Sequence, residues 1–278
     1  MNTIGIIGQG EIGGVLARGF LRTETVKPSD LYVFDRHPEK IERLTKEFGG
    51  VNVCSDAAEA AHNARYLFIC IQPPFIPQLV KELKKHINPG TNLMITTCCV
   101  RLETIKKLYD GKITTLLPTV NCEVGRGVVL ASHNECVTDE EKQFFRSIME
   151  PICHTVKEID ERDYALIDTL SGCMPAFISS FLDTFVREAD AFESSFSKDE
   201  LSAVLKETFI ATAMLFDAKS MEFEQVLKKV GHPGGITFTA LEAFNEGLPA
   251  VIGDLCARSV KKHRQTEDKV DEIIKSLE

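Results

Sequence analysis

The feature that most constrains the fold is the segment Gly8-Gln9-Gly10-Glu11-Ile12-Gly13, between an apolar run at residues 3–8 and an amphipathic stretch that ends at residue 22. In a glycine pattern of this kind the first glycine permits a tight turn from strand to helix. The second lets the backbone approach a pyrophosphate, and the third lets the helix pack closely on the strand. The amides and dipole of the helix start attract negative charge. The segment therefore predicts a dinucleotide-binding turn, and a glycine-rich turn without a ligand is the alternative.

The choice of dinucleotide depends on two neighbouring residues. Asp35 ends the second apolar run, 22 residues beyond Gly13, where a carboxylate accepts hydrogen bonds from the ribose hydroxyls of adenosine and repels a 2′-phosphate. The next residue, Arg36, suits stacking on adenine or pairing with that phosphate. We therefore expect NAD or NADP, with NAD slightly favoured. Without a ligand, Asp35 is a turn former ahead of Pro38.

The spacing of apolar residues divides the chain into two parts. In the first part, apolar runs alternate with amphipathic stretches of about ten residues, the pattern of a parallel sheet covered on both faces. These runs lie at residues 3–8, 31–35, 66–71, 92–97, 113–118, 127–132 and 152–159. We expect an α/β fold in which an N-terminal, doubly wound Rossmann-type domain at residues 1–159 precedes an all-helical domain at residues 160–278.

The helical part implies a partner subunit. Helical spacing is present at residues 175–191, 198–216, 223–230, 237–247 and 249–263. Residues 201–216 are apolar nearly all round, with Lys206 and Glu207 as their only charges. A helix of this kind must be covered on every side, which a domain of about 120 residues does not achieve alone. We expect a homodimer or a larger homo-oligomer.

Composition excludes several classes of protein. The 32 basic and 41 acidic residues give a net charge of -9, which argues against nucleic-acid or membrane-surface binding. Because no apolar run approaches 18 residues, we expect no membrane span and a soluble, cytoplasmic protein. The nine cysteines form no C-x-x-C pair and several lie within apolar runs. This usage predicts buried thiols in a reducing compartment and no metal site.

Two further segments carry a resemblance to a known family. The segment Leu170-Ser171-Gly172-Cys173-Met174-Pro175-Ala176-Phe177 is followed, some 55 residues later, by His232-Pro233-Gly234-Gly235-Ile236-Thr237. Together they resemble the signatures of the pyrroline-5-carboxylate reductase family, approximately LSGSGPAY and SPGGTT. The resemblance implies a Rossmann domain, a helical dimerisation domain that interlocks with its twin, and reduction of a cyclic imine, 1-pyrroline-5-carboxylate, to proline by NAD(P)H. Proline biosynthesis is the corresponding role.

Candidate site residues follow partly from this resemblance and partly from local chemistry. Thr237 matches the family threonine beside the imine nitrogen, so we expect it to be the catalytic donor. Gln72 and Pro73 match a segment along the cofactor ribose. The amides freed by Gly234 and Gly235, ahead of a helix that begins near Ile236, form an anion cradle for a substrate carboxylate. Ser171 completes the predicted substrate site.

Several substrate-side positions depart from the family, and they keep other functions open. His232 replaces a serine and suits a general acid or a carboxylate partner. Cys173-Met174 replaces a Ser-Gly pair, and Cys98-Cys99 replaces an Ala-Gly pair. The alternatives are an NAD(P)-dependent oxidoreductase of another small substrate and a non-catalytic NAD(P)-binding sensor. A β-hydroxyacid dehydrogenase is disfavoured because residues 175–191 lack the lysine that this class uses.

Overall fold

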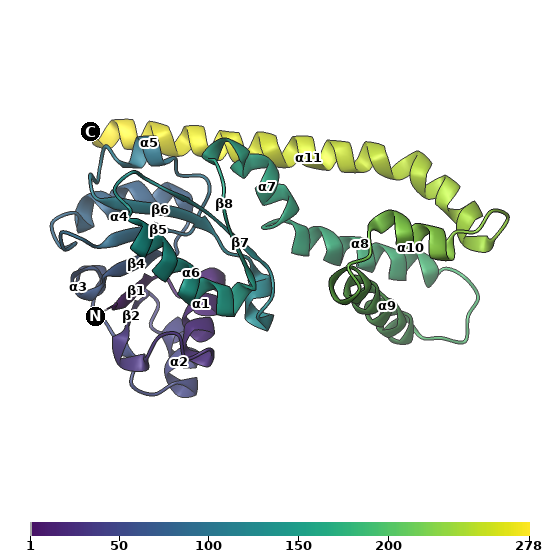
Figure 1. The fold of residues 1–278 in the computed structure, drawn as a ribbon, viewed down its shortest axis with the longest axis horizontal. Helices are drawn as coiled ribbons and strands as arrows, with labels where there is room; N and C mark the ends of the chain where they lie inside the picture. Colours follow the sequence, from purple (N-terminus) through teal and green to yellow (C-terminus); the bar gives the residue numbers. More distant parts are fainter. Residues whose placement is uncertain (1) are drawn as a thin grey trace. The chain divides into compact units, whose positions relative to one another are not determined.

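The computed structural model describes residues 2–278, and the contacts within it divide the chain into two compact units. The first unit runs up to Gly172 and also contains Ser259–Glu278, while the second is Cys173–Arg258. Figure 1 labels the helices and strands in chain order. Because the dinucleotide motif and the predicted substrate loop belong to different units, each unit is described by itself.

The first unit is built on an eight-stranded sheet with the strand order β3-β2-β1-β4-β5-β6-β7-β8. The strands are β1 (Ile4–Ile7), β2 (Leu31–Phe34), β3 (Asn52–Val53), β4 (Tyr66–Ile69), β5 (Asn92–Ile95), β6 (Lys112–Leu117), β7 (Val128–His133) and β8 (Thr155–Glu158). In the register, Ile4 of β1 pairs with Leu31 of β2 and Tyr66 of β4. The strand order reverses between β1 and β4, and ligands of open α/β sheets bind at the carboxyl ends of strands beside such a reversal.

The predicted doubly wound fold is confirmed, with one departure in strand direction. Every strand pair is parallel except β6 and β7, which run antiparallel. Only residues 118–127 connect them, with a short 3-10 turn at Val120–Val124. A parallel connection needs a crossover of a dozen or more residues, so this link is too short for one. The two-residue strand β3 was not among the predicted runs because it is too short to show a periodicity.

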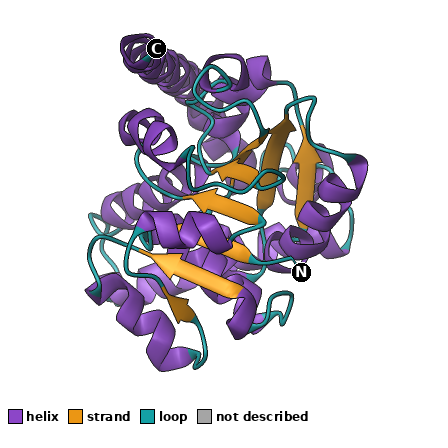
Figure 2. Ribbon diagram, turned by 90° about the vertical axis from the view of Figure 1, so that its left-hand side faces the viewer, coloured by secondary structure: helices purple, strands orange, loops and turns teal. Residues whose placement is uncertain are grey.

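Helices pack on both faces of the sheet, as Figure 2 shows around the orange strands. They are α1 (Glu11–Arg22), α2 (Glu39–Glu47), α3 (Ala57–Asn63), α4 (Ile76–Leu83), α5 (Leu102–Ile105), α6 (Asp139–Cys153) and α7 (Tyr164–Leu170). Every residue of β1, β4 and β5 is buried. This burial explains their near-continuous apolar sequences, because a strand covered on both faces has no polar side.

The second unit is helical, as predicted, and the helix boundaries differ from the prediction at one place. Its helices are α8 (Met174–Ala189), α9 (Lys198–Ala218), α10 (Phe223–Val230) and the first part of α11 (Ile236–Leu277). The two helices predicted at 237–247 and 249–263 are one helix of 42 residues that continues through Pro249. Proline lacks only one donor, and the carbonyl that loses its partner belongs to the exposed Asn245, where water replaces the bond.

The compact units do not coincide with the predicted domain boundary at residue 159. Tyr164 of α7 is 1% exposed and its hydroxyl donates to the Thr115 carbonyl at 3.0 Å, so α7 packs with the sheet. At the other end, Val270 and Ile274 of α11 belong to the apolar core of the first unit. Compact units follow contacts rather than sequence families, so the boundaries 1–159 and 160–278 stay a prediction.

One stretch of the chain needs a correction to the expected absence of membrane-like segments. By length and composition alone, Glu161–Ala189 is apolar enough to cross a membrane, with a mean hydropathy of 1.4 and 11% of its window buried. In the structure the turn at residues 171–173 divides this stretch into α7 and α8. One such stretch is weak evidence for a membrane span, and the composition itself reflects an apolar surface on α8.

Candidate cofactor site and substrate loop

In the glycine turn between β1 and α1, two glycines are required by the fold and the third leaves space for a ligand. Gly8 has a φ of 97°, and a Cβ there would lie 2.4 Å from the Cys70 carbonyl oxygen. A Cβ at Gly13 would lie 1.8 Å from the Gly8 carbonyl oxygen. Both glycines are therefore required by the backbone itself. A Cβ at Gly10, in contrast, would meet nothing within 4 Å, so the space that this glycine leaves open is available to a ligand.

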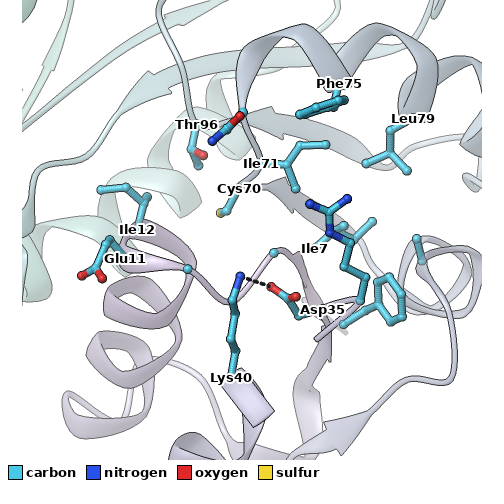
Figure 3. A pocket seen from close by; sticks show the side chains of 16 residues that line it. Ile7, Glu11, Ile12, Asp35, Lys40, Cys70, Ile71, Phe75, Leu79 and Thr96 are labelled. Carbon is cyan, nitrogen blue, oxygen red and sulfur yellow. Dashed lines mark ion pairs between the residues drawn. The ribbon is translucent and has the colours of Figure 1, made fainter. Parts of the chain in front are cut away.

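A cavity of about 590 Å³ opens at this turn and at the carboxyl ends of β1 and β4 (Figure 3). Seven of the ten predicted cofactor residues line it: Gly8, Gly10, Glu11, Ile12, Asp35, Arg36 and Gln72. The other three, Gln9, Gly13 and Pro73, lie beside the lining residues in the chain. The cavity is where the reversal of strand order places a ligand site, so its position follows from the sheet topology.

Asp35 is held in place by backbone amides. The amide of Gln9 donates to Asp35 Oδ2 at 2.7 Å, and the amide of His37 donates to Oδ1 at 2.9 Å. The carboxylate is 9% exposed, and Lys40 Nζ lies 3.9 Å from Oδ2. Both carboxylate oxygens keep further acceptor capacity, because each has two lone pairs. The turn and the second strand thus fix the direction of the acceptor that ribose hydroxyls require.

The sequence analysis missed the apolar side of this cavity. Figure 3 shows Phe75 and Leu79 on one side of the pocket, beyond Ile71. Phe75 is 55% exposed although it is a large aromatic residue. The sequence did contain a signal for this side of the cavity, because Phe75 directly follows the two prolines at 73–74. A short turn after the end of a strand presents its side chains at the edge of the sheet. An apolar slot of this kind fits a flat heteroaromatic ring.

Two polar lining residues, Lys40 and Cys70, were also missed. Lys40 lies on α2, one turn beyond Asp35, and Figure 3 shows its ammonium group directed at that carboxylate. Burial raises the pKa of the Cys70 thiol to about 12, so the thiol stays neutral and serves as a packing group. The arrangement of open turn, fixed carboxylate, two cations and apolar slot fits a dinucleotide.

The predicted substrate loop lies in the second unit. Gly234 has a φ of 78°, and the amide of Gly235 donates to the His232 carbonyl at 2.9 Å, which closes a tight turn. Helix α11 begins at Ile236, which is 93% exposed. Thr237 therefore lies in the first turn of the helix and not at its N-cap, and its exposed hydroxyl donates to none of residues 2–278 in a hydrogen bond. The loop has the geometry of an anion cradle.

Ser171 ends helix α7 in the first unit. Its hydroxyl donates to the Ile167 carbonyl at 2.9 Å, so its own helix satisfies it. The structure brings the cofactor residues together in one cavity and the loop residues together at one helix start. That the two groups act in one site stays a prediction, because they belong to different compact units.

One partly buried acid lies outside both groups. Glu161 accepts hydrogen bonds from the Leu102 amide at 3.0 Å and from the Thr115 hydroxyl at 3.4 Å. Burial raises the pKa of the Glu161 carboxyl to about 7. The acid lines a second, polar cavity of about 480 Å³ with Arg101 and Glu267.

Comparisons with known proteins were made for the two parts of the chain and for the whole. A family described as NADP oxidoreductase, coenzyme F420-dependent, matches residues 3–97. The family described as pyrroline-5-carboxylate reductase dimerisation matches residues 161–266. The chain is 25% identical over 272 residues to pyrroline-5-carboxylate reductase 3 of Bacillus subtilis, covering 97% of this chain and 98% of that protein.

Solved structures agree with the fold. A pyrroline carboxylate reductase from Plasmodium falciparum with NADP bound superposes with a TM-score of 0.84 at 18% identity, covering 95% of this chain and 98% of that one. A pyrroline-5-carboxylate reductase from Coxiella burnetii gives a TM-score of 0.84 at 21% identity, with the same coverage. At these identities the superpositions show that the fold is shared.

Proposed function

We propose that the chain belongs to the pyrroline-5-carboxylate reductase family and reduces 1-pyrroline-5-carboxylate to proline as an NAD(P)H-dependent oxidoreductase. The observation that carries this proposal is the open space at Gly10 beside a fixed Asp35 carboxylate. The backbone can fold without the open space at Gly10, so this space and the carboxylate beside it are attributed to a bound dinucleotide. The relatives match the chain over nearly its whole length, which supports a shared activity.

The residues of the first unit would hold the dinucleotide in a defined orientation. The amides at the start of α1 receive the pyrophosphate, Asp35 accepts from the adenosine ribose, and the slot at Phe75 and Leu79 takes the adenine. When bound, the reduced nicotinamide supplies the hydride. We propose a preference for NADH, because a 2′-phosphate would face a carboxylate that two amides hold in place. Lys40 is already paired with Asp35, which leaves Arg36 as the cation for NADPH.

The loop of the second unit would hold the substrate. The amides of Gly234 and Ile236 at the start of α11 bind the substrate carboxylate, Gly235 closes the turn through its bond to the His232 carbonyl, and Thr237 donates to the imine nitrogen. His232, which this chain has in place of a serine, holds or supplies a proton close to that nitrogen. Reduction of a protonated imine needs orientation more than a strong nucleophile, so these neutral donors suffice.

The proposed oligomeric state and the proposed cellular location rest on the same family resemblance. The second unit carries the dimerisation domain, which supports a homo-oligomer acting on a small molecule. We propose a homodimer or a larger assembly that covers α9, working in the cytoplasm on a metabolite. In this assembly the apolar surface of α9 is buried between subunits.

A single assay tests the activity. Full-length protein is mixed with NADH or NADPH and 1-pyrroline-5-carboxylate, and the loss of nicotinamide absorbance is followed together with proline formation. We expect turnover with both cofactors and faster turnover with NADH. Cofactor binding without turnover on this substrate contradicts the proposal and favours a sensor or another substrate.

The matched variants Asp35→Ala and Arg36→Ala test the cofactor preference. Asp35→Ala should weaken NADH binding more than NADPH binding, and Arg36→Ala should do the reverse. Titration of each cofactor against each variant measures both effects. Equal losses for the two cofactors in Asp35→Ala remove that residue from the specificity.

A further inference from the structure

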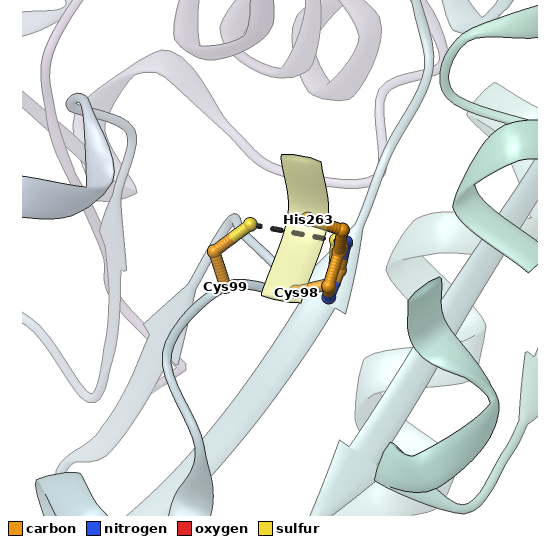
Figure 4. A group of neighbouring side chains, drawn as sticks. All are labelled: Cys98, Cys99 and His263. Atoms are coloured by element: carbon orange, nitrogen blue, oxygen red, sulfur yellow. Dashed lines mark hydrogen bonds between the residues drawn. The ribbon is translucent and has the colours of Figure 1, made fainter. Parts of the chain in front are cut away.

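Cysteine and histidine side chains gather in the first unit away from the glycine turn (Figure 4). None of the nine cysteines forms a disulfide, and only Cys136 is exposed. Cys98 and Cys99 follow β5, and His263 comes from the last part of α11. The Nδ1 atom of His263 lies 3.7 Å from Cys98 Sγ and 3.9 Å from Cys99 Sγ. His263 itself is 5% exposed.

A carboxylate completes this group. Asp168 Oδ2, from α7, lies 3.7 Å from the same Nδ1 atom of His263. The other carboxylate oxygen occupies the space above Gly172, where a Cβ would come within 2.2 Å of it. The absence of a side chain at Gly172 thus leaves room for the carboxylate. Three segments far apart in the sequence thus bring two sulfurs and one carboxylate oxygen to within 3.9 Å of one imidazole nitrogen.

The spacing of three of these atoms suits a metal site, because Cys98 Sγ, Cys99 Sγ and His263 Nδ1 all lie within 4.8 Å of one another. Zinc binds thiolate sulfur at about 2.3 Å and imidazole nitrogen or carboxylate oxygen at about 2.0–2.2 Å, which places neighbouring ligand atoms about 3.3–3.8 Å apart. The three distances from His263 Nδ1 are 3.7, 3.9 and 3.7 Å. Each separation from Nδ1 is therefore within a few tenths of an ångström of the separation between neighbouring zinc ligands, about the tolerance of a real site.

The surroundings of the histidine support a metal ligand. His263 Nε2, the nitrogen on the opposite side of the ring, lies 3.4 Å from Glu267 Oε1. The other oxygen, Glu267 Oε2, lies 3.2 Å from Arg101 Nη2. Metal-binding histidines almost always direct their second nitrogen to a carboxylate or a carbonyl, which fixes the ring orientation. Here an arginine in turn fixes that carboxylate.

We propose that Cys98, Cys99, His263 and Asp168 form a zinc site, with Glu267 as the positioning residue of the histidine. Two thiolates, an imidazole and a carboxylate are ligands that suit Zn²⁺ and not Mg²⁺ or Ca²⁺.

Four protein ligands make this a structural site. The metal would join the end of α11 and α7 to the loop after β5, and that loop begins at Thr96, which lines the cofactor cavity. The sequence predicted no metal site, because its cysteines lack close ligand spacing such as C-x-x-C. The ligands here come from positions 98, 99, 168 and 263, which only the fold brings together. The proposal does not depend on the reductase activity.

Metal analysis of the full-length protein tests the site. Protein purified with reductant and without chelator should contain about one zinc per chain, and the double variant Cys98→Ser/Cys99→Ser should retain less than about a tenth of it. Cys136→Ser is the matched control, because it removes an exposed thiol outside the group, and it should keep its zinc. Equal zinc in the double variant and the wild type overturns the proposal.

Cobalt binding to the metal-free protein gives a second readout that needs no activity. Reduced, chelator-treated protein titrated with Co²⁺ should develop thiolate-to-cobalt absorption that saturates at about one equivalent. Glu267→Gln keeps all four ligands and should weaken Co²⁺ binding by about ten- to a hundredfold. Reduced wild-type protein that develops no such absorption overturns the proposal. A Cys98–Cys99 disulfide that persists in reductant, found by mass spectrometry, does so as well.

Discussion

The two compact units bury their apolar residues to very different extents. In the first unit, β1, β4 and β5 are buried throughout, and helices cover both faces of the sheet. In the second unit, α9 has no buried residue, and Val186 is the only buried residue among the described positions 173–258. Apolar residues thus make a closed core in one unit and an open surface in the other.

The aromatic residues of α8 show what this difference means. Phe181 and Phe185 pack against each other with ring centroids 4.9 Å apart, yet they are 40% and 46% exposed. Exposed apolar surface on this scale marks an interaction site. The match to a dimerisation domain over residues 161–266 explains it. The first unit completes its core within one chain, and the second leaves apolar surface exposed that another subunit would cover in the proposed oligomer.

The largest expected effect is on dimer dissociation, when a lysine replaces an apolar residue of equal exposure in each unit. Val53 in the first unit and Ile210 in the second are both 53% exposed in the single chain. Ile210→Lys should raise the dimer dissociation constant at least about a thousandfold, about 4 kcal/mol, because a two-fold interface meets the substitution twice. Val53→Lys should leave it unchanged. Light scattering over a dilution series measures both, and an unaltered dimer in Ile210→Lys breaks the comparison.

The glycine turn of the first unit offers the next largest effect. Gly13→Ala should destabilise the protein by about 3 kcal/mol, because its Cβ would overlap the Gly8 carbonyl oxygen. Gly10→Ala should leave the unfolding temperature unchanged and weaken cofactor binding by about tenfold or more, about 1.4 kcal/mol. Thermal unfolding and cofactor titration of both variants check this contrast. Loss of stability in Gly10→Ala contradicts the assignment of its open space to a ligand.

A smaller effect is expected in the loop of the second unit. Thr237→Ala should lower turnover by about ten- to a hundredfold, about 1.4–2.7 kcal/mol of barrier, with unchanged cofactor binding. His232→Ser restores the family residue and should flatten the dependence of turnover on pH between about 6 and 8 if the imidazole supplies the proton. Initial rates across that pH range measure both. Normal turnover in both variants contradicts the role of the loop.

The smallest effect concerns a partly buried acid of the first unit, Glu161. The pKa of Glu161 is raised to about 7 in the folded protein, above its ordinary value of 4.5. The unfolded chain therefore loses this proton first, and the stability that protonation provides is lost as pH rises from about 4.5 to 7. Glu161→Gln should gain about 1 kcal/mol at pH 8 and nothing at pH 5. Urea unfolding at the two pH values tests this, and an equal gain at both pH values contradicts it.

Much of the fold was predictable because it depends on local patterns. The apolar runs predicted seven strands, and the glycine turn and Asp35 predicted the cofactor site, where seven of ten residues line one cavity. Strand direction at β7 and the continuous helix through Pro249 were not predictable in this way. The direction of β7 depends on the length of the connection from β6, and the continuous helix depends on the exposure of the backbone near Pro249 to water. Neither property is visible in the periodicity of apolar residues.

The sequence by itself determined the elements of the sheet, the glycine turn and the apolar character of α9, because these depend on side-chain size and polarity at neighbouring positions. The tertiary structure alone decided the rest. It placed Lys40 and Phe75 at the cofactor cavity. It also brought Cys98, Cys99 and His263 together across more than a hundred and sixty residues of sequence. Proximity of this kind comes from chain folding, since no residue spacing encodes a contact between distant segments.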